Sequence, residues 1–268
     1  MLLVHGWGVS GALFEAQIDA LAPRYRLIVP DLPGHGASGP FPKHAPFSLL
    51  ADSLAALIDE LELQHPLVVG WSLGALVAWD LLLRYRDLGV AGLVTIDMVP
   101  HVLNDAAWSH GLREGSDSHA FGRDLEAMRA DWNAYAELFV PRIFAPGFDD
   151  GPGGRLEQTR AIARANDPES QITIWKRMVE KDLRGALRTI EVPALCVCGE
   201  RSQLYSVAAC EWVAAQMPHA RTAVIPGAGH APHLEAPDHF NTVLSEFADS
   251  VIENHPEITL QPAETGLD

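Results

Sequence analysis

The chain has 268 residues, of which 48% are hydrophobic, and a formal net charge of −16. This length suits one large domain, or a domain with an insert. The acidic balance argues against binding to nucleic acid or to an anionic membrane, and no apolar run reaches the roughly 18–20 residues of a membrane span.

The amino-terminal stretch and the cysteines indicate the compartment. The opening MLLVHGWG has neither a basic leader nor a cleavage site, so we expect no signal peptide. There are three cysteines, and two of them share one apolar run, which favours buried, reduced thiols over a disulfide framework. No second ligand cluster accompanies the Cys-x-Cys pair, so we expect no metal site. The reduced cysteines and the opening stretch together favour a cytoplasmic protein.

Short apolar runs alternate with helix-like stretches along most of the chain. The runs are rich in Val, Ile and Leu, as is typical of strands buried on both faces. Amphipathic segments between them predict helices packed on both sides of a parallel sheet. The predicted strands, about six, are residues 2–5, 26–30, 67–70, 93–97, 194–199 and 222–226.

Residues 98–190 break this rhythm with several helical patterns and no convincing strand. We expect them to form a helical cap over a core made of residues 1–97 and 191–253, followed by a flexible tail, 254–268. Most aromatic side chains of the cap are expected to pack it onto the core, and a few to line an apolar acyl pocket. The pocket candidates are Trp71, Trp108, Trp132, Phe139 and Phe144.

The strongest chemical signal is Gly-Trp-Ser-Leu-Gly at residues 70–74, which matches the G-x-S-x-G turn of a nucleophilic serine. An apolar strand precedes it and an amphipathic helix follows it. Small residues at both ends of the motif let strand and helix approach closely. The pattern therefore predicts Ser72 as a nucleophile at the carboxyl end of a strand, beside free amides of the helix start.

A second strand ends in His-Gly-Trp-Gly at residues 5–8. Backbone N–H groups after such a strand can point at the same reacting oxygen as those of the helix start. We predict an oxyanion hole formed by the N–H groups of Trp7 and Leu73. His5 stands beside this turn, where a structural role is favoured over a catalytic one.

The sequence Gly-Ala-Gly-His follows the last predicted strand and offers His230 as the general base. The order of serine first and histidine late suits this arrangement of strands. His233 and His239 are competitors for the same role. The stretch DLPGHG at residues 31–36 is interpreted as a structural turn.

Taken together, LLVHGWG, DLPGHGASG, GWSLGALVAWD and GAGHAPHLEAPDHF resemble the α/β-hydrolases, in particular small bacterial carboxylesterases and the pimeloyl-carrier-protein methyl esterases. The resemblance covers roughly residues 1–97 and 191–252. It implies a Ser-His-acid triad, an oxyanion hole of two amides and no cofactor.

The chain departs from this family at its amino end. The family normally begins with a hairpin of two strands before the His-Gly strand, and this chain starts on that strand. We therefore expect a wholly parallel sheet of about six strands in which the strand at 26–30 is an edge. That edge is expected to be exposed or used in a contact between copies of the chain.

The second departure concerns the acid of the triad, because Ser202 occupies the usual acid position. Asp97 ends the predicted strand that follows the helix after Ser72, and Glu200 lies two residues before Ser202. One branch of small esterases resembles this chain at both places, with Ile-Asp-x-x-Pro at 96–100 and a serine near Tyr205. We predict Asp97 as the acid, with Glu200 as the alternative and the absence of a working acid as a third interpretation.

These features together predict a serine hydrolase that cleaves carboxylic esters of short to medium apolar acyl chains through an acyl-enzyme. Its partner would be a small-molecule ester. A thioesterase, a carbon–carbon bond hydrolase or an acyltransferase would use nearly the same apparatus. A non-catalytic ligand-binding homologue is the alternative from another class.

Overall fold

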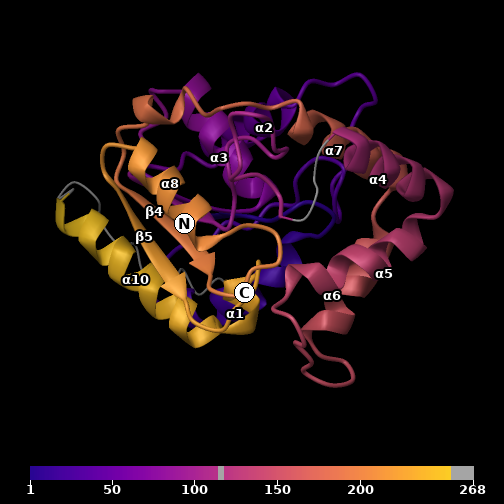
Figure 1. Ribbon diagram of the computed structural model, residues 1–268. Helices are drawn as coiled ribbons and strands as arrows, with labels where there is room; N and C mark the ends of the chain where they lie inside the picture. The colour runs from indigo at the N-terminus through magenta and orange to yellow at the C-terminus, as the bar shows by residue number, and fades with distance from the viewer. Residues whose placement is uncertain (114–117, 255–268) are drawn as a thin grey trace.

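The computed structural model describes residues 1–113 and 118–254, and within them five parallel strands form one sheet in the order β1-β2-β3-β4-β5 (Figure 1). All four pairings are parallel. Apart from residue 254, the predicted flexible tail lies outside the described residues. The strands are β1 (Leu2–Val4), β2 (Leu67–Trp71), β3 (Gly92–Ile96), β4 (Ala194–Gly199) and β5 (Ala220–Ile225).

Helices cover both faces of this sheet, because neighbouring residues of each strand point to opposite sides. In β2, Val68 belongs to the core on one face of the sheet, whereas Val69 belongs to the core on the other face. The helices on the first face are α2 (Ser48–Glu60), α3 (Leu73–Arg84) and α8 (Val207–Gln216). Those on the second are α1 (Glu15–Leu21), preceded by the 3-10 turn η1 (Gly11–Phe14), and α10 (Pro237–Asn254), preceded by α9 (Pro232–Glu235).

The prediction of a sixth strand at 26–30 is wrong. Ile28 forms one isolated parallel bridge with Leu2, through bonds from Leu3 N to Ile28 O (2.8 Å) and from Ile28 N to Met1 O (2.9 Å). β1 itself spans three residues, and Pro30 has no N–H to extend the ladder. The segment therefore runs beside β1 without becoming a strand.

Among the described residues between β3 and β4 there are four α-helices, and they gather to one side of the sheet (Figure 1). Local capping explains where two of them begin: Asp131 accepts a hydrogen bond from Ala134 N, and Asp167 accepts one from Ser170 N. The helices are α4 (Ser118–Ala130), α5 (Trp132–Ile143), α6 (Arg155–Ala165) and α7 (Pro168–Val179), and the 3-10 turn η2 (Leu187–Thr189) follows them. Of the helices described, none is long and apolar enough to cross a membrane.

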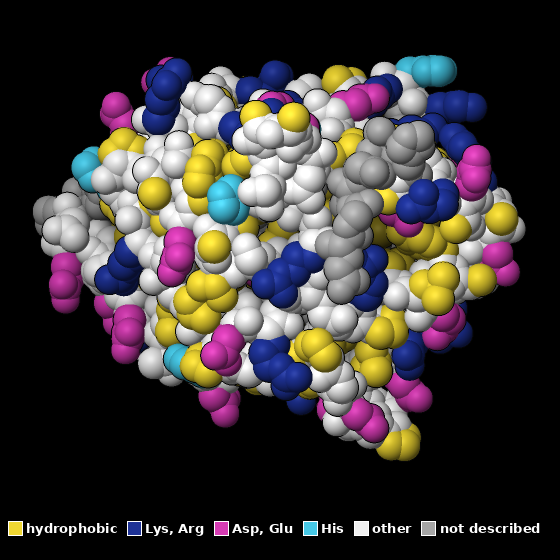
Figure 2. Space-filling view, in the orientation of Figure 1, with side chains coloured by type: hydrophobic (Ala, Val, Ile, Leu, Met, Phe, Trp, Pro, Cys, Tyr) yellow, Lys and Arg dark blue, Asp and Glu magenta, His cyan; other side chains and the backbone are white. Residues whose placement is uncertain are grey.

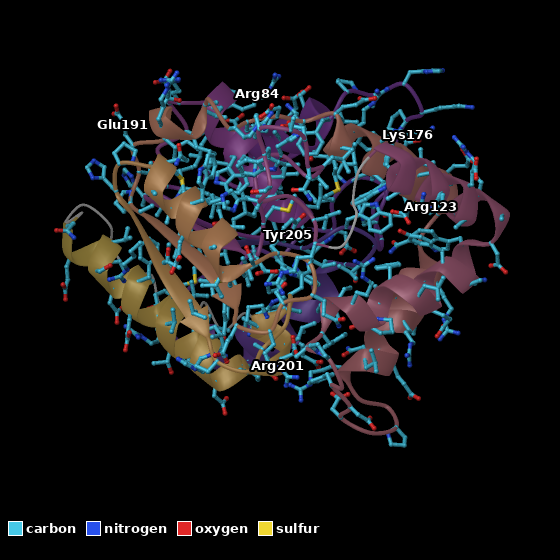
Figure 3. All side chains as sticks on the ribbon, viewed as in Figure 1. Arg84, Arg123, Lys176, Glu191, Arg201 and Tyr205 are labelled. Carbon is cyan, nitrogen blue, oxygen red and sulfur yellow. The ribbon has the colours of Figure 1, made fainter. Side chains whose placement is uncertain are left out.

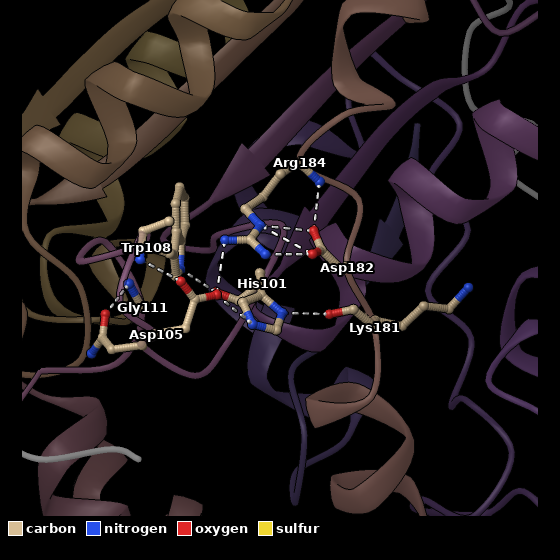
Figure 4. Close-up of polar contacts among 9 residues, drawn as sticks. His101, Asp105, Trp108, Gly111, Lys181, Asp182 and Arg184 are labelled. Carbon is tan, nitrogen blue, oxygen red and sulfur yellow. Dashed lines mark hydrogen bonds and ion pairs between the residues drawn. The ribbon is translucent and has the colours of Figure 1, made fainter. Parts of the chain in front are cut away.

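The two ends of this helical insert are tied to each other (Figure 4). The ring of His101, after β3, donates from Nδ1 to the carbonyl of Lys181, at 3.0 Å. Arg184 bonds both Asp182 (2.6 Å) and Asp105 (3.2 Å). These ion pairs are partly exposed, so each is worth little by itself. Together with the backbone bond between residues 183 and 100, they fix the base of the insert beside the sheet.

The face of the molecule seen in Figure 2 mixes acidic and basic side chains, with hydrophobic ones in small groups between them. The net charge of −16 is therefore not gathered into one acidic patch on that face.

Candidate active site

The turn between β2 and α3 holds Ser72 in a strained conformation. Its φ is 53° and its ψ is −115°, a left-handed backbone that costs energy for a residue other than glycine. The neighbouring glycines permit the close contact that the turn needs. A Cβ on Gly74 would lie 2.1 Å from Val4 O, and one on Gly70 would lie 2.4 Å from Gly74 O. This turn, called the elbow below, therefore requires glycine at positions 70 and 74.

His230 and Asp97 meet at the carboxyl ends of the strands. His230 Nδ1 lies 2.6 Å from Asp97 Oδ2, and both side chains are buried. Asp97 directly follows β3 with a φ of 47°, a left-handed conformation that aspartate tolerates better than most residues. Because Nδ1 faces the carboxylate, Nε2 is the nitrogen left to accept a proton.

The electrostatics of Asp97 combine burial with hydrogen bonding. Burial raises the pKa of this carboxyl group, and the hydrogen bonds from His230 and then from Ser202 oppose that rise. Ser202 Oγ lies 2.6 Å from Asp97 Oδ2, the same oxygen that faces His230. The residue at the usual acid position thus contacts Asp97, the predicted acid, which follows the neighbouring strand.

Trp71 joins the elbow to the loop that holds His230, called the histidine loop below. Its Nε1 donates to the backbone carbonyl of His230 at 2.9 Å, and its ring lies 5.8 Å from the His230 ring, centre to centre. The hydrogen bonds of the described residues do not include one between Ser72 Oγ and His230. Trp71, a predicted pocket residue, is 1% exposed and packs beneath the site.

The other candidates for acid and base lie elsewhere. The Glu200 carboxylate accepts a hydrogen bond from Gly227 N at 2.9 Å and is exposed. His239 is exposed at the start of α10. His233 is fully buried against Phe14 and Trp71, and within the described chain neither of its ring nitrogens has a hydrogen-bond partner. Burial lowers the pKa of His233 to about 3.

The loop after β1 lies against the elbow. A Cβ on Gly6 would come 3.4 Å from the Cβ of Ser72, so Trp7 follows directly on the chain beside the serine. Leu73 is the first residue of α3, where N–H groups have no partner inside the helix. Over the residues that the structure covers, no hydrogen bond uses the backbone N–H of Trp7 or Leu73.

Two buried histidines shape this loop. Nε2 of His5 accepts a hydrogen bond from Leu32 N (2.9 Å), and Nε2 of His35 accepts one from Gly8 N (3.3 Å). Burial lowers the pKa of His5 to about 4, so this ring is neutral near pH 7. The loop is held by neutral imidazoles that act as acceptors, in agreement with a structural role for His5.

Aromatic side chains of the insert pack around Trp7. Its ring centre lies 5.6 Å from that of Trp132, 5.1 Å from Phe139 and 5.2 Å from Trp175. The indole Nε1 of Trp7 donates to Gln171 O in α7 at 3.0 Å. The insert therefore contacts the loop beside the serine through an aromatic cluster, here defined as Trp7, Trp132, Tyr135, Phe139 and Trp175.

The remaining pocket candidates are packed elsewhere. Trp108 lies edge-on to Trp212 of α8, with ring centres 4.7 Å apart, and Arg184 lies over its ring. Phe144 is 1% exposed and stacks on Phe148, with ring centres 4.7 Å apart. These rings pack the insert onto the two cores that flank the sheet, Trp108 onto one and Phe144 onto the other, rather than surround Trp7.

Glu235 is a half-buried carboxylate that the sequence analysis missed. Its Oε1 accepts a hydrogen bond from Gly229 N (2.7 Å), and its Oε2 accepts one from Ala145 N (2.8 Å). It therefore joins the residue before His230 to the chain after α5. An acidic residue five positions after the histidine was the only sequence signal for it.

Tyr205 lies near the middle of the molecule, whereas Arg123 and Lys176 lie on the insert (Figure 3). The ring centre of Tyr205 is 5.8 Å from that of His230. Across residues 1–113 and 118–254, no group of three or more His, Cys, Asp or Glu side chains is arranged to hold a metal ion.

Comparison with known proteins identifies the family. The model of the Alpha/beta hydrolase family matches residues 1–241. The chain is 31% identical to the pimeloyl-(acyl-carrier protein) methyl ester esterase of Stenotrophomonas maltophilia (strain K279a) over 251 residues, which are 92% of each protein. It is 30% identical to the enzyme of the same name from Edwardsiella ictaluri (strain 93-146), over 93% of each.

Solved structures share the fold. A thermophilic esterase from Thermogutta terrifontis, with malate bound, is 29% identical with a TM-score of 0.82, over 93% of this chain and 89% of that one. An esterase from Exiguobacterium antarcticum has a TM-score of 0.85 at 21% identity, over 92% of this chain and 91% of that one, a likeness of fold alone. With a family model matched along most of its length, this chain belongs to the alpha/beta hydrolase family.

Proposed function

We propose that this protein is a serine esterase in which Ser72 is the nucleophile, His230 the general base and Asp97 the acid. The observation that supports it most is the 2.6 Å contact between His230 Nδ1 and Asp97 Oδ2, buried beside the strained turn of Ser72. Relatives that bear the name of esterase cover more than nine-tenths of this chain.

In the first half of the proposed reaction, Ser72 Oγ attacks the carbonyl carbon of the ester while His230 Nε2 takes the hydroxyl proton. The N–H groups of Trp7 and Leu73 donate to the oxyanion that forms. The intermediate then collapses, the carbon–oxygen bond to the alcohol breaks, and His230 returns the proton to the leaving oxygen.

In the second half, water attacks the acyl-enzyme and gives its proton to His230. The second intermediate collapses, the acid is released, and the proton returns to Ser72. Throughout, the Asp97 carboxylate keeps the proton on Nδ1 and stabilises the charged imidazole. One oxyanion donor is typically worth about 10²–10³ in rate.

The proposed substrate is a carboxylic ester with an apolar acyl chain of short to medium length. The aromatic cluster beside the oxyanion loop supports this choice, because aromatic side chains favour apolar groups. Of the pocket candidates, Trp132 and Phe139 belong to this cluster and are retained in the proposal. Trp71, Trp108 and Phe144 are left out of it, because their rings pack against His230, Trp212 and Phe148 rather than against Trp7.

The test is covalent labelling with a fluorophosphonate probe, followed by mass spectrometry of the labelled peptide. Wild type is expected to be labelled at Ser72 and to hydrolyse p-nitrophenyl butyrate, and Ser72→Ala to do neither. The matched control is Ser53→Ala, which removes a hydroxyl that donates to Leu50 O within α2. Equal labelling of wild type and Ser72→Ala, or no labelling of either, would contradict the proposal.

A further inference from the structure

Ser202 brings a buried hydroxyl to the carboxylate of Asp97. The residue lies in the turn after β4 and is 1% exposed. Its Oγ is 2.6 Å from Asp97 Oδ2, a length typical of a strong hydrogen bond to a charged oxygen. The hydroxyl and the ring of His230 therefore share one oxygen of the carboxylate.

The surrounding turn fixes the direction in which this hydroxyl donates. A hydroxyl has one hydrogen and two lone pairs. The backbone N–H groups of Leu204 and Tyr205 donate to Ser202 Oγ, at 3.2 and 3.3 Å. Since these two amides occupy the lone pairs, the single hydrogen is left for Asp97.

This arrangement favours the charged carboxylate. Burial raises the pKa of Asp97, and hydrogen bonds from His230 and from Ser202 oppose the rise. A carboxylate that receives two donors is held both in its ionised form and in one rotamer. Both properties are needed to orient an imidazole.

We propose that Ser202 is a positioning residue of the esterase reaction, whose hydroxyl holds the Asp97 carboxylate against His230 and stabilises its charge. The inference rests on the proposed function, because it requires Asp97 to be the acid of the triad. Ser202 acts through Asp97, because the hydrogen bonds of its hydroxyl are to that carboxylate and to two backbone amides of its own turn.

Other titratable groups also sense the charge of Asp97, namely Tyr205, Cys210 and Glu235. Burial raises the pKa of Tyr205, and a hydrogen bond with Cys198 followed by burial raises that of Cys210, so both are neutral in the acid range. Burial also raises the pKa of Glu235. Tyr205, Cys210 and Glu235 are present in every variant described below, so each variant's pH profile contains the same contribution from them.

The test is the pH profile of kcat/KM for Ser202→Ala with p-nitrophenyl butyrate. Without the donor, the charged Asp97 carboxylate loses a stabilising hydrogen bond, so the active form is lost earlier as the pH falls. We expect the midpoint of the acid limb to rise by about one pH unit and kcat at pH 7 to fall by about tenfold. KM is expected to stay within about twofold, because Ser202 does not face the substrate.

Three further variants separate this role from a structural one. Ser206→Ala removes a neighbouring hydroxyl that caps α8 through Ala209 N, and it is expected to leave the acid limb unchanged. Ser202→Thr keeps the hydroxyl and is expected to restore the wild-type limb. Ser202→Cys, a weaker donor of similar size, is expected to shift the limb in the direction of alanine and serves if the alanine variant does not fold.

A double variant tests whether Ser202 acts through Asp97. In an Asp97→Asn background, Ser202→Ala is expected to cause no further loss of kcat. An unchanged acid limb in Ser202→Ala, or an equal tenfold loss in both backgrounds, would overturn the inference. Near-wild-type activity of Asp97→Asn alone would instead remove the proposed triad, so the two failures are distinguishable.

Discussion

Two groups of buried histidines lie at the carboxyl ends of the strands, and they differ in what their ring nitrogens contact. After β5, His230 faces the carboxylate of Asp97. After β1, His5 and His35 accept hydrogen bonds from backbone N–H groups. The first histidine has a partner that stabilises its charged form, whereas the other two have partners that require the neutral ring.

The difference shows why the residue type alone does not identify a base. A histidine that accepts from an N–H group cannot be protonated without losing that bond, so it serves as a fixed acceptor. The pKa of His5 is lowered to about 4, mainly by burial. In our proposal, one region moves protons and the other holds the shape of the loop that contains Trp7.

The largest expected effect comes from removing the negative charge of Asp97, the partner of His230. Asp97→Asn keeps the size of the side chain, and asparagine tolerates the left-handed φ of 47°. We expect kcat to fall by about 10³–10⁴, because the amide favours the wrong tautomer of His230. The measurement is hydrolysis of p-nitrophenyl butyrate, with the fold checked by circular dichroism. Activity within tenfold of wild type would exclude Asp97 as the acid.

The family could be identified from the sequence, because its motifs are local patterns. A strand followed by Gly-x-Ser-x-Gly and a helix is visible in the residues around Ser72. The prediction of a sixth strand was wrong, because an apolar run becomes a strand only beside a strand that can form backbone hydrogen bonds along its length. β1 is too short for this. Ile28 therefore forms a single bridge.

The contacts that position His230 could not be predicted, because they join segments that are distant in the chain. Glu235 links residue 229 to the end of α5, and Trp71 links the elbow to the histidine loop. Ser202 was interpreted as a vacant acid position, yet its hydroxyl contacts Asp97. No periodicity or spacing encodes which buried donor meets which acceptor.

The second prediction concerns the neutral region and its effect on stability. In the unfolded chain a histidine has a pKa of about 6.5, and in the folded protein that of His5 is about 4. Between these values the unfolded state binds more protons, so the free energy of unfolding falls as the pH falls. The part due to His5 is on the order of 3 kcal/mol.

His5→Gln tests this, because glutamine offers an acceptor for Leu32 N–H but does not titrate. The gap between the unfolding free energies of wild type and variant is expected to change by that amount between pH 6.5 and pH 4. Urea unfolding at a series of pH values measures it. His233 is present in both proteins and cancels in the comparison, whereas a charge on His5 opposes the protonation of the neighbouring His35 in wild type alone. Parallel curves would show that His5 is protonated equally in both states.

A smaller effect is expected where the insert meets the histidine loop. Glu235 offers one oxygen to Gly229 N and one to Ala145 N. Glu235→Gln turns one of these acceptors into an NH₂ group that faces an N–H, which costs about 1–3 kcal/mol. We expect a lower melting temperature and a several-fold fall in kcat. Thermal unfolding and kinetics check this, and a variant with unchanged kcat would show that Glu235 does not position His230.

The smallest effect is expected at Glu200, the alternative acid. Its carboxylate is exposed and accepts a hydrogen bond from Gly227 N, so it stabilises the turn after β5 rather than the imidazole. Glu200→Gln retains an oxygen that can accept this bond, and an exposed hydrogen bond contributes little. We therefore expect kcat to stay within about twofold of wild type. A loss near that of Asp97→Asn would mean that the turn rearranges in solution and that the acid of His230 comes from the turn after β4, which also holds Ser202.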